Sequence, residues 1–124
     1  VIDDARNRVT DVVRGDDLLP STARQLLFYR LLELDPVPRY WHLPIVIGED
    51  GRRLAKRHGD TRIASYREAG VSADRVVGLL ARWSGLVDRP APMTAEEFQR
   101  AFGIEKVPAE PIIFHEADHR WLTG

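Results

Sequence analysis

The sequence predicts an α/β fold in which two parallel strands joined by a helix are followed by an all-helical segment. A run rich in β-branched residues at 9–13 and a second short apolar run at 42–47 indicate the strands, with a helix-period pattern between them. After residue 61, apolar side chains recur at helical spacing in stretches that end at glycines. We therefore divide the chain into 1–62, part of a sheet domain, and 63–124, a helical segment.

The first strand is predicted at Val9–Val13, because four of its five residues are β-branched and such residues favour strands. Helix-start residues follow at Pro20–Thr22, and the prolines of Asp35–Pro38 end the helix. Before the first strand, we expect Val1–Asp4 to be the end of another strand, as in a chain cut from a longer one. The predicted helix carries an apolar face made of Ala23, Leu26, Leu27, Leu31 and Leu34.

The second strand is predicted at His42–Ile47, and a tight turn follows it. Asp50-Gly51 is a strong turn signal, so Arg52–Leu54 is expected to fold back as a hairpin arm. Lys56 and Arg57 would then lie on a loop just beyond this arm.

Four helices are expected after the hairpin, with limits set by glycines and capping residues. Thr94 and Glu97 have the spacing of a capping box, and the two prolines of Val87–Pro92 make that stretch the clearest linker. The predicted helices are Ile63–Ala69, Ser72–Ser84, Thr94–Phe102 and Glu116–Leu122.

The composition excludes several classes of protein. The chain has 124 residues and no cysteine, which excludes disulfide frameworks, cysteine-ligated zinc and thiol nucleophiles. Its 18 Lys and Arg against 19 Asp and Glu give a net charge of -1, which argues against binding nucleic acid by charge alone. No apolar run approaches the ~20 residues that cross a bilayer, so we expect a cytoplasmic protein that does not contact membranes.

A basic cluster lies in Arg52–Arg62, a stretch that contains five cationic residues and a single acidic residue, Asp60. On a loop, such cations could follow developing charge on transferred phosphates, and the alternative is a solvated surface turn. Lys56 and Lys106 are the only lysines, so Lys56 within an arginine cluster indicates a need for a compact point charge.

Arg14 stands at the end of the first predicted strand. Ligands of open α/β sheets bind at the carboxyl edge of the strands, where an arginine could pair with a substrate carboxylate. A structural ion pair with Asp3, Asp16 or Asp17 is the alternative, and residue types alone do not separate the two.

His115-Glu116-Ala117-Asp118-His119 matches the His-Glu-x-x-His pattern of zinc proteases. We interpret the match as coincidence, because no further ligand follows it and the other two histidines lie in a different segment. We therefore expect no metal to be bound by this chain, and a short helix with a solvated polar face explains the same residues.

Four segments occur in one order along the chain: Val9–Gln25, His42–Pro44, Arg53–Arg57 and Arg120–Gly124. In that order they resemble the glutamyl-tRNA synthetase group of class I aminoacyl-tRNA synthetases, over nearly the whole chain. Arg53–Arg57 stands where that group has its mobile signature loop, often written Lys-Leu-Ser-Lys-Arg.

The resemblance implies the C-terminal half of a Rossmann-like catalytic domain, followed by a helical segment that contacts tRNA. It implies ATP-dependent activation of glutamate, with Mg²⁺ accompanying ATP, and transfer of the glutamate to tRNA. By position, Arg14 corresponds to the arginine that holds the amino-acid carboxylate, and Lys56 to the signature lysine that stabilises the ATP phosphates. Residues matching those that line the adenosine are Leu18, Ile45 and Val46.

The signature loop departs from the group's pattern at two positions. Arg53 replaces its first lysine, and Ala55 replaces a serine hydroxyl, so both changes bear on the loop's efficiency. The remaining motifs, including His-Ile-Gly-His, belong to an upstream half of the catalytic domain. We therefore expect the isolated chain to be inactive.

Two branches of the group, and one other class, remain as alternatives. Ile104–Ile112 is more similar to the Val-Pro-x-Glu-Pro ending of glutamyl-queuosine tRNA(Asp) synthetases, which attach glutamate to queuosine, and we favour that branch. The second branch is an ordinary glutamyl-tRNA synthetase. The other class is a tRNA-binding module without catalysis.

Overall fold

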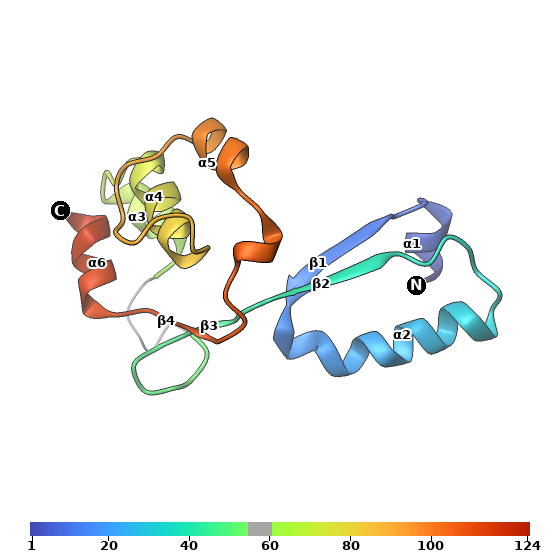
Figure 1. Cartoon of the computed structure of the whole chain (residues 1–124). Helices are drawn as coiled ribbons and strands as arrows, with labels where there is room; N and C mark the ends of the chain where they lie inside the picture. The colour runs from blue at the N-terminus through green and yellow to red at the C-terminus, as the bar shows by residue number, and fades with distance from the viewer. Residues whose placement is uncertain (55–60) are drawn as a thin grey trace. The chain divides into compact units, whose positions relative to one another are not determined.

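The computed structural model describes residues 1–54 and 61–124. The chain forms two compact units, Val1–Ile45 and Val46–Gly124, which Figure 1 shows with their elements labelled. The packing of the units does not test the predicted limit of the sheet domain near residue 62, which stays a prediction.

The first unit contains a parallel strand pair connected through a helix. Its strands pair in register from Asp11 opposite Arg39 to Gly15 opposite Leu43. The predicted strand–helix–strand order is confirmed, although the first strand begins two residues later than expected. The elements are α1 (Ile2–Arg6), β1 (Asp11–Gly15), the 3-10 turn η1 (Asp16–Leu18), α2 (Leu19–Leu31) and β2 (Arg39–Leu43).

The prediction of a strand at Val1–Asp4 is wrong, because these residues begin helix α1. Asp3 and Asp4 lie in its first turn and Arg6 in its last, an arrangement that complements the helix dipole. Two apolar residues followed by two acids could not maintain the alternation of a half-buried strand.

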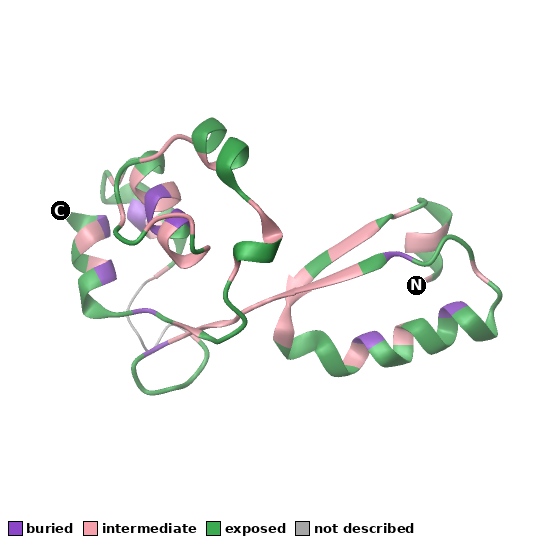
Figure 2. Cartoon of the chain, viewed as in Figure 1, coloured by how far each residue is buried: buried purple, intermediate pink, exposed green. Residues whose placement is uncertain are grey.

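Helix α2 turns a polar face toward the interior of the first unit. Its buried residues are Thr22 and Tyr29, whereas Leu26, Leu27 and Leu31 of the predicted apolar face are exposed. Figure 2 shows α2 mainly in the exposed colour, with buried residues at two places. Periodicity found the apolar stripe, but it could not say which face the strands of this unit cover.

The second predicted strand, His42–Ile47, is in fact two. Strand β2 ends at Leu43, and Val46–Ile47 forms the separate strand β3 in the second unit. Pro44 explains the interruption, because proline has no backbone N–H to donate to a ladder.

Within its described residues, 46–54 and 61–124, the second unit contains a two-stranded parallel sheet and four α-helices. Val46 pairs with Ile112, and Ile47 with Ile113. The prediction that 63–124 is all-helical is therefore wrong, because Ile112–Ile113 forms a strand. A strand of two residues is too short to produce a periodic pattern in the sequence. The elements are β3 (Val46–Ile47), α3 (Ile63–Glu68), α4 (Ala73–Trp83), α5 (Ala95–Ala101), the 3-10 turn η3 (Ile104–Lys106), β4 (Ile112–Ile113) and α6 (Glu116–Thr123).

The predicted turn and hairpin arm are present in reduced form. Gly51 adopts φ 72°, a conformation that favours glycine, and the Gly48 amide donates to the Arg52 carbonyl at 2.8 Å. The returning arm makes a single antiparallel bridge, Ile47 with Arg53, and the Leu54 amide donates to Val46.

Each of the four predicted helices is present, with both ends within one residue of the prediction. The Thr94 capping box is also confirmed: its hydroxyl accepts from the Glu97 amide, while the Thr94 backbone donates to the Glu97 carboxylate. The Thr94 backbone amide, followed by the Thr94 hydroxyl, donates to the Glu97 carboxylate and lowers the pKa of Glu97. In the part of the chain that the structure describes, no helix is long and apolar enough to span a bilayer.

The core of the second unit gathers side chains from three helices and the segment after β4. Tyr66, Leu79, Phe114 and Leu122 are buried together, with Trp83 packed edge-on to Phe114. Gly78 of α4 faces the linker so closely that a Cβ would lie 1.9 Å from the Ala91 carbonyl oxygen. A glycine at this point therefore lets the linker cross the helix.

Candidate functional site

Arg14 lies at the carboxyl end of β1, and among the described residues its guanidinium contacts a hydroxyl, a carbonyl, an imidazole and an aromatic ring. Its Nη2 donates to Thr22 Oγ1 at 2.5 Å and to the Leu18 carbonyl at 3.4 Å. Its Nε lies 3.5 Å from His42 Nε2, and the Tyr40 ring lies 5.1 Å away. Among the described residues, Arg14 therefore forms no ion pair with Asp3, Asp16 or Asp17, which was the alternative to a ligand-binding role.

Three elements bring this Arg14 cluster together, which we define as Arg14, Thr22, Tyr40 and His42. The parallel register sets Arg14 directly beside His42, and Tyr40 two residues earlier points to the same side of the strands. Thr22, in the first turns of α2, completes the cluster with Oγ1 2.8 Å from His42 Nε2. The cluster therefore depends on β1, α2 and β2 packing together.

The Arg14 guanidinium retains donors for a ligand. Arginine carries five N–H donors, and the contacts within the described residues use Nε and Nη2. The two hydrogens of Nη1 are thus available to a carboxylate, an anion that a guanidinium binds through charge-assisted hydrogen bonds. This arrangement can bind an anionic group at the edge where the sequence placed a ligand.

The contact surface between α2 and the strands is unusually polar. Among the described residues, the buried atoms Gln25 Oε1, Tyr29 Oη and Tyr40 Oη have no hydrogen-bond partner. Burial raises the pKa of Tyr29 and of Tyr40, so both phenols are neutral at physiological pH. The two phenols therefore add no charge beside Arg14.

The opposite face of the strand pair holds a separate polar group. Asp11 accepts from the Trp41 indole at 2.9 Å and pairs with Arg39 Nε at 2.9 Å. The indole bond, followed by Arg39, lowers the pKa of Asp11 to about 2. Arg39 also lies over the Trp41 ring, so this arginine is already engaged by an acid and an aromatic ring.

Two of the predicted adenosine-lining residues lie near Arg14 in the first unit. The Leu18 carbonyl accepts from Arg14, and Ile45 lies close to Gly15, where its Cγ2 would be 3.7 Å from an added Cβ. The third, Val46, begins β3 of the second unit and packs against the core there. Their predicted roles toward ATP are not tested by these contacts.

The predicted signature loop, Arg53–Arg57, is only partly within the described residues. Arg53 bridges to Ile47, and Leu54 packs against the core of the second unit. Ala55, Lys56 and Arg57 lie outside the described residues. The predicted role of Lys56 therefore remains a prediction from sequence.

The two histidines of the zinc-like pattern are bonded to different partners. His115 Nδ1 lies 3.1 Å from Glu49 Oε1, and His119 Nδ1 lies 3.1 Å from the Tyr66 hydroxyl. No group of three metal-ligating side chains occurs within residues 1–54 and 61–124. His119 and Glu49 instead border an open cavity of about 300 Å³.

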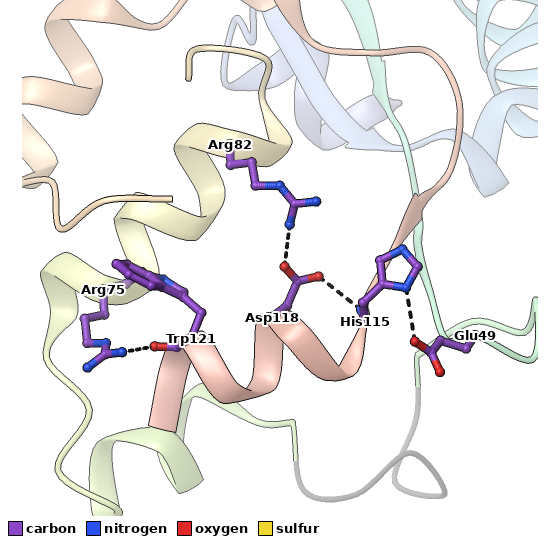
Figure 3. Close-up of polar contacts among 6 residues, drawn as sticks. All are labelled: Glu49, Arg75, Arg82, His115, Asp118 and Trp121. Carbon is purple, nitrogen blue, oxygen red and sulfur yellow. Dashed lines mark hydrogen bonds and ion pairs between the residues drawn. The ribbon is translucent and has the colours of Figure 1, made fainter. Parts of the chain in front are cut away.

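The same segment has a structural explanation, which Figure 3 shows. Asp118, almost fully buried, accepts from the His115 backbone amide at 3.0 Å and pairs with Arg82 Nη1 at 2.5 Å. Its carboxylate thus caps the start of α6 and ties that helix to α4. Arg75 and Trp121 form a second link between these helices, each donating to the other's backbone carbonyl.

Residue patterns point to Arg14 but not to its partners Thr22, Tyr40 and His42. Thr22 carries the signal of a helix start, and His42 that of the first residue of a strand. The order of β1, α2 and β2 was visible in the sequence, but the register that places these side chains together was not.

A comparison with protein families shows to which family this chain belongs. The family model described as tRNA synthetases class I (E and Q), catalytic domain, matches residues 1–121. The chain belongs to this family. It is thereby a member of the glutamyl-tRNA synthetase group of class I aminoacyl-tRNA synthetases, as the resemblance indicated.

Relatives from both branches of the group are similar to this chain. It is 53% identical to the glutamyl-Q tRNA(Asp) synthetase of Symbiobacterium thermophilum over 112 residues, covering 90% of the chain and 34% of that protein. It is 35% identical to the glutamate–tRNA ligase of Aquifex aeolicus over 126 residues, covering 100% of the chain and 26% of that protein. The chain thus spans between a quarter and about a third of these relatives' length.

A solved structure supports the same fold. The chain is similar to a glutamate–tRNA ligase from Elizabethkingia meningosepticum, solved in complex with its amino acid. The TM-score is 0.78 at 28% identity, and the match covers 98% of the chain and 28% of that protein. The parallel strands and this likeness confirm the α/β, Rossmann-like expectation.

Proposed function

We propose that this chain supplies the C-terminal part of the catalytic core of an enzyme that activates glutamate with ATP and transfers it to tRNA. The observation that carries the proposal is the guanidinium of Arg14 at the carboxyl end of β1, held by Thr22, His42 and the Leu18 carbonyl and with Nη1 available. The family gives this carboxylate-binding geometry its context, since its members named above act on glutamate.

In this proposal the residues divide the work between amino acid and nucleotide. Arg14 binds a carboxylate of glutamate, while Leu18, Ile45 and Val46 line the adenosine. A glutamate carboxylate oxygen attacks the α-phosphorus of ATP, and pyrophosphate leaves as the glutamyl-adenylate forms. Lys56 stabilises the negative charge that accumulates on the departing phosphates, and Mg²⁺ accompanies ATP.

The choice of tRNA belongs to the same proposal. Greater identity to the glutamyl-Q tRNA(Asp) synthetase, 53% against 35% for the glutamate–tRNA ligase, supports transfer to queuosine of tRNA(Asp). The similarity of Ile104–Ile112 to the ending of that branch points the same way. Residues 63–124 would contact the tRNA, and a cytoplasmic location is part of this proposal.

Exchange of pyrophosphate into ATP tests the activation step in the complete gene product. Lys56→Ala is expected to lower the glutamate-dependent exchange rate by at least 100-fold with an unchanged melting temperature, because it removes a cation needed in the transition state. Lys106→Ala, which removes the other lysine, is the matched control and should retain the rate. Equal rates in both variants would contradict the role of Lys56.

Transfer of labelled glutamate tests the acceptor. We expect tRNA(Asp) with queuosine to accept glutamate, and the same tRNA without queuosine to accept none. Charging of tRNA(Glu) instead would assign the chain to an ordinary glutamyl-tRNA synthetase. Binding of tRNA without any glutamate-dependent exchange would leave only the non-catalytic module.

A further inference from the structure

We infer that Thr22 and His42 are positioning residues that fix the Arg14 guanidinium through two consecutive hydrogen bonds. The inference rests on the proposed role of Arg14 and extends it to side chains that do not themselves touch glutamate. Its basis is the chain of contacts from Arg14 Nη2 through Thr22 Oγ1 to His42 Nε2, at 2.5 and 2.8 Å.

A long arginine side chain needs such support. Its guanidinium can occupy many rotamers, so binding a carboxylate in one geometry costs conformational entropy unless the group is already held. Thr22 is suited to this task because it is 8% exposed and lies on α2 rather than on a loop. A threonine in a helix has few χ1 rotamers, and the contacts with Arg14 and His42 hold the Thr22 hydroxyl in one of them.

One assignment of donors and acceptors satisfies all the contacts among the three side chains. Arginine has only donors, so Thr22 Oγ1 accepts from Nη2, and its own hydroxyl hydrogen is directed to His42 Nε2. His42 Nε2 is then the acceptor, a role that also suits the nearby Arg14 Nε at 3.5 Å. His42 thus orients the hydroxyl, and the hydroxyl orients the guanidinium.

The remaining contacts of Arg14 complete the restraint. The Tyr40 ring lies 5.1 Å from the guanidinium carbon, and the Leu18 carbonyl accepts from Nη2. Because His42 is paired directly with Arg14 in the parallel register, any shift of β1 against β2 would break the hydrogen-bond chain. The strand pair and α2 together therefore set the direction in which the Nη1 hydrogens point.

A purely structural role for Thr22 and His42 predicts a different response to substitution. If they only fill space, apolar side chains of similar volume would replace them without effect on substrate affinity. If they position Arg14, loss of the hydroxyl or of the ring acceptor weakens glutamate binding selectively, while ATP binding is unchanged. Substitutions that keep a hydroxyl or an acceptor should recover most of the loss.

Steady-state pyrophosphate exchange by the complete gene product separates these responses. We expect Thr22→Val and His42→Leu to raise the KM for glutamate by about tenfold or more, the cost of a lost hydrogen bond to a charged group. The KM for ATP should change less than about twofold. Thr22→Ser and His42→Gln should return the glutamate KM most of the way to that of the unmodified protein, and Thr22→Val should add little in an Arg14→Ala background.

Arg14→Ala in the same assay distinguishes failure of this inference from failure of the proposed function. An unchanged glutamate KM in Arg14→Ala would overturn the proposed role of Arg14. A raised KM in Arg14→Ala with unchanged values in Thr22→Val and His42→Leu would overturn only the positioning role. Equal rises in the KM for glutamate and the KM for ATP would also overturn the positioning role. If His42→Leu does not fold, Thr22→Val alone tests this role, because valine is close to threonine in volume.

Discussion

Asp118 uses both carboxylate oxygens inside the second unit, one toward Arg82 and one toward the amide of His115. The residue is 1% exposed, so an oxygen without its partner would have no water in its place. Hydrogen bonds and ion pairs made by residues such as Asp118 therefore explain the polar residues around α6. A metal site of the His-Glu-x-x-His type is not needed to explain them.

Asp118→Asn is expected to lower the free energy of unfolding by about 2 kcal/mol, because it removes the charge from a buried hydrogen-bonded pair. Urea denaturation of the 124-residue chain measures the change. Glu116→Gln, an exposed position on the same helix, is the control and should change stability by less than about 0.5 kcal/mol. Equal effects at the two positions would contradict the link between α6 and α4.

Asp11 predicts a pH dependence of stability. Its pKa is lowered from 3.8 to about 2 in the folded chain, so the carboxylate contributes stability that is fully present above the unfolded value and is lost as the pH falls toward 2. The stability difference between the chain and an Asp11→Asn variant should therefore shrink between roughly pH 5 and 2. Denaturation at a series of pH values measures it, and a constant difference would contradict the pairing with Trp41 and Arg39.

Sequence reasoning reached Arg14 but not the residues that hold it. An arginine directly after a β-branched run is visible as a candidate ligand-binding residue. Thr22 and His42 carry no such signal, because their roles depend on which residues of β1 and β2 lie opposite one another. Register of this kind is a property of the packed pair, not of either strand.

At the scale of elements, local sequence signals predict the positions of the helices after residue 62 well and those of the strands poorly. Capping residues and glycines determine where α3, α4, α5 and α6 begin and end, so each appears close to its predicted place. Strand β4 owes its existence to pairing with β3, and α1 to charges at its ends, neither of which alternating hydrophobicity detects. Pro44 was the one local sign that the second strand is divided.

Gly78 gives a prediction at this scale. Alanine is a better helix former than glycine by about 1 kcal/mol, so propensity alone predicts that Gly78→Ala stabilises α4. The structure predicts the opposite, a loss of about 1–3 kcal/mol, because the new Cβ would collide with the Ala91 carbonyl. Thermal unfolding decides between them, and a raised melting temperature would show that the linker does not cross α4 at this glycine.

At the scale of the whole molecule, the family relationship unites features that either unit alone leaves unexplained. The first unit carries a guanidinium at the carboxyl edge of a parallel pair, and the second begins with the arm that leads into the signature loop. The sequence predicted this order because the group's motifs are local and ordered along the chain. The division between Ile45 and Val46 follows from packing, which no motif records.

The most direct measurement of the central claim is the KM for glutamate in pyrophosphate exchange by the complete gene product carrying Arg14→Ala. Binding of the substrate carboxylate by Arg14 predicts a rise of roughly 100-fold, the scale of a lost charge-assisted contact to a substrate carboxylate. Arg39→Ala, on the opposite face of the same strands, should leave that KM within about threefold. Equal KM values in Arg14→Ala, Arg39→Ala and the unmodified protein would contradict the account.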